Sequence, residues 1–193
     1  MNMTRHARVL EPADLRVVLK HARKTQAQRN TVIVLLSYKA GLRACEIAGL
    51  SWPMVVTASG EVAACIDLSG TVTKNGRPRV IPLNKELARA LAALHKLHGW
   101  PRDGPVIRSQ RGGHMTARSV VNWFAEIYAE AGLMGCSSHS GRRTFVTRAA
   151  RALVKAGGSL RDVQELVGHS SLSTTERYIQ GDRAAQHRLV QLA

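Results

Sequence analysis

The stretch that decides the fold runs from Ser137 to Ile179 and reads SSHSGRRTFVTRAARALVKAGGSLRDVQELVGHSSLSTTERYI. It places His139 three residues before Arg142, His169 directly after a glycine, and Tyr178 nine residues beyond that second histidine. A guanidinium offers a planar fork of donors that matches two oxygens of a phosphate. An imidazole can move a proton near neutral pH, and a phenol oxygen can bond covalently to phosphorus. These side chains suit a phosphodiester better than a hydrophobic core.

The spacing at the start of this stretch predicts a helix that carries both His139 and Arg142 on one face, where they can meet one phosphate. Apolar residues then recur at intervals of three and four, as an amphipathic helix requires; they are Phe145, Val146, Ala149, Ala150, Leu153 and Val154. Ser137 or Ser138 is the predicted N-cap, where free N–H groups also favour an anion. A basic surface helix with a partly buried histidine explains this pair equally well.

The composition indicates a polyanionic partner. The chain has 193 residues and a net charge of +15, from 28 Lys and Arg against 13 Asp and Glu. Hydrophobic residues make up 45%, which is typical of a folded domain rather than a disordered chain. No acidic residue lies between Glu130 and Asp162, a segment that contains Arg142, Arg143, Arg148, Arg151 and Lys155. A polyanion is therefore the leading candidate for the partner.

Cysteine spacing and hydropathy argue against other classes. Cys45, Cys65 and Cys136 lie far apart without a C-x-x-C pair, so neither a zinc site nor a disulfide framework is predicted. The longest apolar run, from Thr31 to Leu36, is too short to cross a membrane. The basic N-terminus lacks the apolar region of a signal peptide. We expect a soluble intracellular protein.

Further helices are predicted from caps and apolar spacing outside the opening helix. They cover residues 10–24, 41–52, 84–98, 116–132, 159–167 and 173–181, and the last of them carries Tyr178. Asn84, Thr116 and Ser159 are the expected N-caps. The 116–132 helix is expected to turn its apolar residues inward: Val120, Val121, Phe124, Ile127 and Tyr128.

Two regions require a choice between secondary structures or a turn signal to interpret. The run from Asn30 to Gly41 is open between strand and helix, because its β-branched residues favour a strand whereas Asn30 as cap and Gly41 as stop favour a helix. Residues 62–68 and 79–83 are rich in strand formers, and Asn75-Gly76 between them is a strong turn signal. A small antiparallel sheet of two or three strands is predicted, with Lys74 immediately before the turn.

The order of these motifs resembles the tyrosine recombinases, the phage-integrase family. The sequence has Gly-Leu-Arg-x-x-Glu from Gly41, Lys74 beside a β-turn, His-x-x-Arg from His139, and then the segment GHSSLSTTERYI from Gly168. The matches extend from about Leu10 to Tyr178 and correspond to the family's C-terminal catalytic domain. The resemblance implies a mainly α fold with a small antiparallel β-sheet at one edge, the DNA breaking-rejoining architecture. It also favours a buried helix for residues 30–41.

The resemblance sets the expected domain organisation. Residues 1–9 form a basic arm, residues 10–180 the catalytic domain, and residues 181–193 a tail helix for contacts between protomers. The helical core-binding domain that family members usually carry before the catalytic domain is not expected here. Two positions depart from the family pattern, Gly141 where leucine is usual and Arg143 where histidine is common, and a different local backbone is expected there.

The resemblance also implies a role for each motif residue. Tyr178 would be the nucleophile, His139 its general base, and Lys74 the acid that protonates the departing 5′-oxygen. Arg43, Arg142 and His169 would bind the phosphate oxygens, and Glu46, three residues after Arg43, would orient the site. The implied reaction needs no metal, ATP or other cofactor, because the arginines supply the positive charge and the phosphotyrosyl ester conserves the bond energy.

The implied partners are double-stranded DNA and further copies of the chain, which would be a monomer in solution and a tetramer on DNA. Accessory DNA-bending proteins and a bacterial cytoplasmic location at the nucleoid are also expected. Three functions remain open from the sequence. The first is a site-specific recombinase or integrase; the second is an enzyme like the type IB topoisomerases; the third is a non-catalytic DNA-binding remnant.

Overall fold

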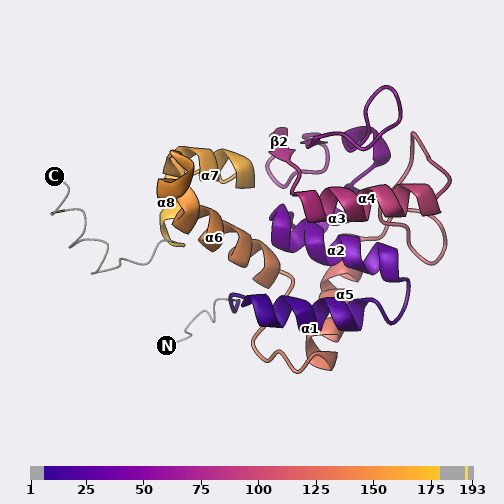
Figure 1. Cartoon of the computed structure of the whole chain (residues 1–193), viewed down its shortest axis with the longest axis horizontal. Coiled ribbons are helices and arrows are strands. Elements are labelled where there is room, and N and C mark those ends of the chain that lie inside the picture. Colours follow the sequence, from indigo (N-terminus) through magenta and orange to yellow (C-terminus); the bar gives the residue numbers. More distant parts are fainter. Residues whose placement is uncertain (1–6, 179–189, 191–193) are drawn as a thin grey trace.

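The structure, a computed structural model, describes residues 7–178 and residue 190 of the chain. Helices dominate and the sheet is small, which confirms the predicted fold class (Figure 1). The elements are α1 (Pro12–Ala22), α2 (Ala27–Lys39), α3 (Ala44–Gly49), a 3₁₀ turn η1 (Trp52–Met54), β1 (Cys65–Leu68), β2 (Arg79–Pro82), α4 (Lys85–Leu97), α5 (Ala117–Glu130), α6 (Ser140–Ala156), α7 (Leu160–Val167) and α8 (Leu172–Glu176). Within the described residues, no helix combines the length and the apolar character that crossing a bilayer demands.

Three helices begin where the sequence predicts. Asn84 Oδ1 accepts a hydrogen bond from the Glu86 N–H at 2.9 Å, and Thr116 Oγ1 accepts one at 3.0 Å from the N–H three residues on. At α7 the carboxylate of Asp162 reaches back to accept from the N–H and the hydroxyl of Ser159, at 2.6 and 2.7 Å. Both arrangements stabilise the first turn of a helix. The predicted caps of α4, α5 and α7 are confirmed.

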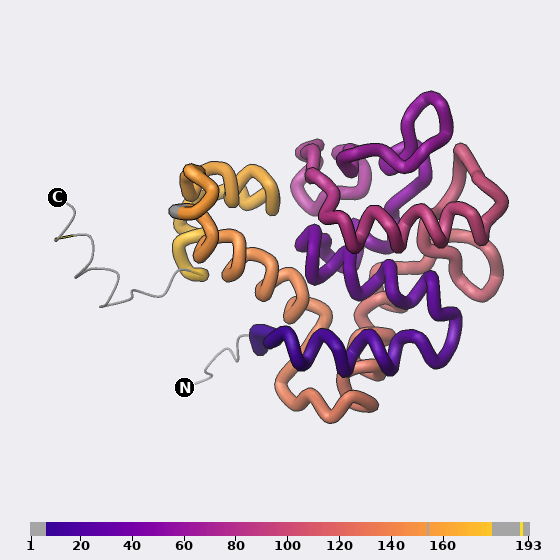
Figure 2. Tube along the Cα trace, viewed as in Figure 1, coloured from indigo at the N-terminus to yellow at the C-terminus, as the bar shows by residue number. Residues whose placement is uncertain are grey.

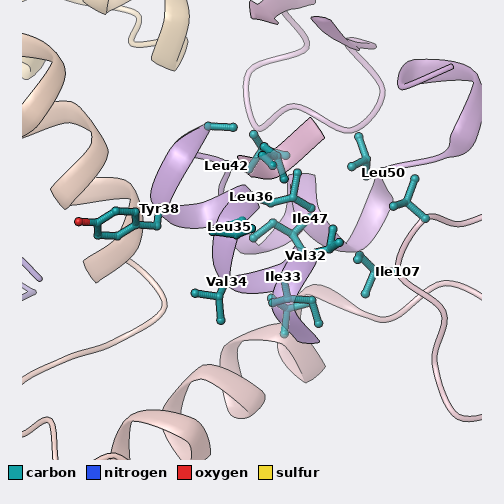
Figure 3. Packing of buried hydrophobic residues seen from close by; sticks show 14 of the residues in the cluster. Val32, Ile33, Val34, Leu35, Leu36, Tyr38, Leu42, Ile47, Leu50 and Ile107 are labelled. Atoms are coloured by element: carbon teal, nitrogen blue, oxygen red, sulfur yellow. The ribbon is translucent and has the colours of Figure 1, made fainter. Parts of the chain in front are cut away.

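Helix α2 is the centre of the main core. Every residue from Val32 to Leu36 is buried, and Figure 3 shows these side chains packed with Leu42, Ile47 and Leu50, which follow α2 in the chain, and with Ile107. A helix buried all round has no one-sided pattern, so periodicity alone cannot distinguish it from a strand. The helix that the resemblance implies for this run is confirmed.

The two ends of α2 differ in how well the sequence predicts them. Gly41 follows the helix with a left-handed φ of +65°, as expected of a C-terminal stop. The predicted cap Asn30 is wrong, because the helix begins a turn earlier, at Ala27. Asn30 is instead buried inside the helix, and its side-chain amide donates to the Thr25 carbonyl at 2.6 Å.

The sheet consists of two antiparallel strands, β1 and β2, with Cys65 opposite Pro82 and Leu68 opposite Arg79. Gly76 adopts the expected left-handed φ of +66°, but its turn lies within the longer connection of residues 69–78 rather than joining the strands directly. Val62 forms only an isolated bridge with Val56, so the predicted strand at 62–68 begins three residues later.

Helices α6, α7 and α8 form a group beside the main body (Figures 1 and 2). Their own small core contains Val146, Val163 and Val167, with Phe145 and Tyr178 among the side chains packed against it. The group meets the main body where α6 contacts α2 and where α7 contacts β2. These junctions bring the motif residues of the two parts together.

Two glycines allow α6 to lie close to the end of α2. A Cβ at Gly141 would be 2.4 Å from Ser37 Oγ and 2.9 Å from Ser37 Cβ, and one at Gly41 would be 2.5 Å from Phe145 Cδ1. Gly141 lies within the regular helix α6. Its departure from the family pattern therefore concerns packing against α2, and the expected change of local backbone is not seen at this residue.

We expect Gly141→Ala to lower the free energy of unfolding by about 1 kcal/mol, measured by urea denaturation. Overpacking costs about 1–3 kcal/mol, and the gain from replacing a helical glycine recovers only about 0.5–1 kcal/mol of it. Gly113→Ala is the control for adding a methyl group without overpacking, because Gly113 lies in a loop and its Cβ would meet nothing within 4 Å. An unchanged or raised stability of Gly141→Ala would show that α2 and α6 can move apart without cost.

Other sequence predictions need correction. The N-cap of α6 is His139 rather than Ser137 or Ser138, although Ser137 Oγ accepts a hydrogen bond from the His139 N–H at 3.3 Å. Helix α8 ends at Glu176, so Tyr178 follows the helix instead of lying on it. Val121 is 42% exposed, at the edge of the apolar face of α5. The arm at residues 1–6 and the tail at 181–193, Val190 apart, lie outside the described residues.

Candidate active site

Side chains from separate parts of the fold line one open pocket of about 460 Å³. They are Arg43 at the start of α3, His139 and Arg142 at the start of α6, His169 after α7 and Tyr178 after α8. Ala7, Gly135, Ser137, Arg143 and Thr174 complete the lining. The structure therefore brings together five of the six residues for which the sequence predicts a direct part in the chemistry.

Arg142 is the most deeply buried cation of the pocket, with 4% of the residue exposed. Its Nη1 donates to the Gly41 carbonyl and its Nη2 to the Val167 carbonyl, both at 2.6 Å. Burial, and then the charge of Arg43, lowers the pKa of Arg142 to about 9, so it remains protonated at neutral pH. A guanidinium has five N–H donors, so Arg142 keeps further donors for a bound anion.

Arg43 is bound by Glu46, three residues later in the sequence. Arg43 Nη1 donates to Glu46 Oε1 at 3.0 Å, and the Arg43 N–H donates to Glu46 Oε2 at 2.8 Å. Burial of Glu46 raises its pKa, but hydrogen bonds and charge from Arg79 outweigh this effect and leave the pKa below its ordinary value. Glu46 is therefore an ionised carboxylate inside the protein, paired with two guanidiniums.

His169 is oriented by Thr175, which is fully buried. The imidazole Nδ1 lies 2.9 Å from Thr175 Oγ1. Burial, followed by the charges of Arg142 and Arg43, lowers the pKa of His169 to about 4. The imidazole is neutral at pH 7 and carries one ring proton, and in the tautomer in which Nδ1 accepts from the Thr175 hydroxyl that proton lies on Nε2. In that tautomer His169 can donate a hydrogen bond to an anion.

The lowered pKa of His169 predicts that stability falls as the solution becomes acidic. Unfolded chains bind a proton on this histidine below about pH 6.5, whereas the folded protein binds it only near pH 4. The free energy of unfolding should therefore decrease between pH 6.5 and pH 4, and less steeply in His169→Gln. Urea denaturation of both proteins from pH 8 to pH 4.5 measures this difference. If the free energy of unfolding fell equally steeply in both proteins below pH 6.5, the prediction would be wrong. Above pH 7 the free energies of unfolding of the two proteins should differ by a constant amount.

His139 stands at the start of α6 among positive charges. Partial burial, and then the charges of Arg142, Arg43 and Lys74, lowers its pKa below the ordinary value. The imidazole is therefore neutral near pH 7 and able to accept a proton.

Tyr178 lies against the other pocket residues. Its ring stacks on that of His169, with the centroids 5.8 Å apart and the planes 20° from parallel. Arg143 Cζ lies 5.8 Å from the centre of the same ring. These contacts hold the Tyr178 ring at the pocket.

Of the six residues predicted to take a direct part in the chemistry, Lys74 is the one that does not line the pocket. It is exposed on the 69–78 connection, one residue before the Asn75-Gly76 turn. Burial is the largest cause of the lowered pKa of His139, and the charge of Lys74 contributes the least, after Arg142 and Arg43.

Sequence reasoning missed Arg79 and Thr175. Arg79 binds both oxygens of Glu46 at 2.8 Å, and Thr175 contacts His169. Thr175 lies six residues after His169, but no motif in the sequence marks it as the partner of that histidine. Nothing local in the sequence distinguishes Arg79 from the other arginines. Among the described residues, no three His, Cys, Asp or Glu side chains form a group able to hold a metal ion.

Fold and pocket together define a class: a basic, mainly helical domain with a pocket lined by arginines, histidines and a tyrosine. Residues 8–184 match the model of the phage integrase family. The tyrosine recombinase XerC of Pelobacter propionicus is 32% identical over 152 residues, covering 78% of this chain and 47% of the relative. That of Mesorhizobium japonicum is 33% identical over 162 residues, covering 82% and 48%. The chain belongs to the phage integrase family and spans about half the length of these curated relatives.

Solved structures share the fold. The crystal structure of XerA recombinase aligns with a TM-score of 0.70 and 22% identity, covering 95% of this chain and 64% of that one. The Tn1549 transposon integrase, in complex with a circular intermediate DNA, aligns with a TM-score of 0.75 and 20% identity, covering 99% and 67%.

Proposed function

We propose that this chain is the catalytic part of a site-specific DNA recombinase or integrase, which cleaves and rejoins double-stranded DNA through a 3′-phosphotyrosyl intermediate. The observation that carries the proposal is the convergence of Arg43, His139, Arg142, His169 and Tyr178 on one pocket. The relatives named tyrosine recombinases and the integrase solved with DNA support it.

The proposed reaction starts with the phenol oxygen of Tyr178, which attacks a backbone phosphorus while its proton passes to His139. The bond from phosphorus to the 5′-oxygen breaks, and that oxygen takes a proton from Lys74. The products are a 3′-phosphotyrosyl ester and a free 5′-hydroxyl. A 5′-hydroxyl from another strand reverses these steps and joins the strands. The ester conserves the energy of the broken bond, so the scheme needs no ATP, metal or other cofactor.

Arg43, Arg142 and His169 stabilise the five-coordinate phosphorus in this scheme. Negative charge builds up on the two non-bridging oxygens, and preorganised donors aimed at such charge contribute roughly 3–4 kcal/mol each. Supporting this role, hydrogen bonds to other parts of the protein fix Arg142 and Arg43. Glu46 orients the site and does not react.

Lys74 has to approach the pocket to serve as the acid. It lies on the exposed connection between β1 and β2, and its side chain is long and flexible. We infer that this connection closes over the phosphate when DNA binds, bringing the ammonium to the departing oxygen.

Further along α6, beyond the residues that line the pocket, three basic side chains are proposed to bind DNA phosphates. Arg148, Arg151 and Lys155 recur there at intervals of three and four, and all three are exposed. Such residues bind phosphates without reading bases, so DNA affinity should fall steeply as salt rises.

The proposed assembly follows from the same scheme. Residues 10–180 form the catalytic domain, residues 1–9 a basic arm, and residues 181–193 a tail that contacts a neighbouring protomer. Exchange between two sites needs four active tyrosines, so the chain is a monomer in solution and a tetramer on DNA, with accessory DNA-bending proteins as further partners. The bacterial cytoplasm, at the nucleoid, is the proposed location.

The experiment is a covalent trap that selects the target sequence and the reacting residue together. The protein is incubated with nicked duplexes whose central sequence is randomised, and adducts that survive denaturation are isolated. The attached DNA is sequenced, and the modified residue is identified by peptide mapping. Adducts at Tyr178 on a shared sequence, followed by strand exchange between two copies of that sequence, would support the proposal.

Two outcomes of this experiment would contradict the proposal and indicate a different function. Adducts without a shared sequence, together with relaxation of any supercoiled plasmid, would indicate an enzyme like the type IB topoisomerases. DNA binding without any adduct across the library would indicate a non-catalytic DNA-binding protein.

A further inference from the structure

The C-terminal end of α7 is bound by three different arginines. Each donates to one of three consecutive carbonyls: Arg79 Nε to Leu166 at 3.1 Å, Arg142 Nη2 to Val167 at 2.6 Å, and Arg43 Nη2 to Gly168 at 3.4 Å. The last carbonyls of a helix lack partners within it and carry the negative end of its dipole. This helix end thus holds three guanidiniums close together, directly before His169.

Arg79 differs from the other two in having no part in the pocket wall. Its side chain is 7% exposed. Nη1 and Nη2 each donate to one oxygen of Glu46 at 2.8 Å, and Nε donates to the Leu166 carbonyl. A Cβ at Gly168 would be 3.2 Å from both Arg79 Cδ and Arg79 Nη1, so the guanidinium packs tightly against the backbone that leads into His169.

From these contacts we infer that Arg79 is a positioning residue of the phosphate pocket, an inference that rests on the proposed function. It acts on Arg43 through Glu46, and on His169 through the end of α7. It joins β2, α3 and α7, three elements that approach one another only in the folded chain.

The contact with Glu46 explains why an arginine is needed. Glu46 Oε1 accepts from Arg79 Nη1 and Arg43 Nη1, and Oε2 accepts from Arg79 Nη2 and the Arg43 backbone N–H, so the filled carboxylate binds the Arg43 side chain by a single N–H. Without Arg79, the carboxylate could take two N–H groups of Arg43 as a bidentate pair, which is the favoured geometry. Arg43 would then turn its donors from the phosphate to Glu46. Arg79 therefore keeps Arg43 available for the ligand.

The test uses the full chain and the duplex recovered by covalent trapping, under single-turnover conditions. We expect Arg79→Gln to slow adduct formation about 10²-fold, because displacing a catalytic group by about 1 Å has an effect of this size. The dissociation constant for the same DNA should change less than about twofold, because nearly all of the side chain is inaccessible to DNA. Arg161→Gln is the control, an exposed arginine paired with Glu165 on α7, and should leave the rate unchanged.

Arg79→Lys separates charge from geometry and covers the case in which Arg79→Gln does not fold. It keeps a cation beside Glu46, but one ammonium cannot reproduce the planar fork and also reach Leu166. We expect adduct formation nearly as slow as in Arg79→Gln. A wild-type rate in folded Arg79→Lys would overturn the inference, and so would equal losses of rate and DNA affinity in either variant.

A double variant with Glu46→Gln tests whether Arg79 acts through Glu46. If Arg79 acts on Arg43 through Glu46, the double variant Arg79→Gln/Glu46→Gln should be slower than Glu46→Gln alone by much less than 10²-fold. If the rate loss of the double variant equalled the product of the two single losses, Arg79 and Glu46 would act independently, which would contradict the inference.

Wild-type protein decides the matter if both arginine variants unfold. Titration with inorganic phosphate should shift the NMR signals of the Arg43 and Arg142 guanidiniums and leave that of Arg79 in place. A shift of Arg79 as large as theirs would make it a phosphate contact instead of a positioning residue. Absence of any shift, or of any wild-type adduct, would count against the proposed function itself.

Discussion

Replacement of Tyr178 by phenylalanine is expected to abolish the covalent DNA adduct while leaving DNA binding almost unchanged. Phenylalanine retains the ring that stacks on His169 and contacts Arg143, and it retains the packing against Val146, Val163 and Val167. Only the attacking oxygen is lost, and no other group of the pocket replaces it in the proposed reaction. Denaturing electrophoresis after incubation with the trapped duplex should show no adduct, and the dissociation constant should change less than about twofold.

Tyr128→Phe is the matched control for Tyr178→Phe. Tyr128 is 3% exposed in the main core, on α5, and the change removes one hydroxyl without touching the pocket. Adduct formation should be unchanged in this variant. A Tyr178→Phe protein that still formed adducts at the wild-type rate would place the nucleophile elsewhere and remove the basis of the proposed mechanism.

Much of the fold could be predicted because local signals agree with tertiary packing. In α1, the residues Leu15, Val18, Leu19 and Ala22 are predicted as the inward stripe, and all are buried. The caps of α4, α5 and α7 are likewise local, since each bond spans two or three residues. The start of α2 could not be predicted in the same way, because Gln26, in a left-handed conformation with φ 43°, carries no signal of a helix start.

The pocket could be predicted only in part, because many of its contacts join residues that lie far apart in the sequence. Motif order identifies Arg43, Arg142 and His169, but their hydrogen bonds run to Gly168, Gly41, Val167 and Thr175. Arg79 reaches Glu46 across 33 positions of the sequence. A charge count treats it as one more basic residue, although it is buried and bound to a carboxylate. Its position follows from the meeting of β2 with α7, which no local pattern encodes.

Arg142→Lys is expected to slow adduct formation about 10²–10³-fold, as the loss of one preorganised donor does elsewhere. Lysine keeps the positive charge, but its single ammonium cannot bond the Gly41 and Val167 carbonyls and still present a planar pair of donors to a phosphate. One buried carbonyl should lose its partner, which lowers the free energy of unfolding by about 1–3 kcal/mol. Single-turnover kinetics and urea denaturation measure the two effects separately.

Arg142→Ala would confuse these effects, because it removes the bond between the ends of α2 and α7 altogether. Arg102→Lys is the better comparison. Arg102 also bridges two carbonyls, those of Ala58 and Ser59, at 3.0 and 3.4 Å, but on an exposed loop. If Arg142 acts on the phosphate, Arg142→Lys should lose rate far in excess of its loss of stability, and Arg102→Lys should lose neither. A wild-type rate in Arg142→Lys would reduce Arg142 to a structural cross-link, leaving Arg43 and His169 to hold the phosphate.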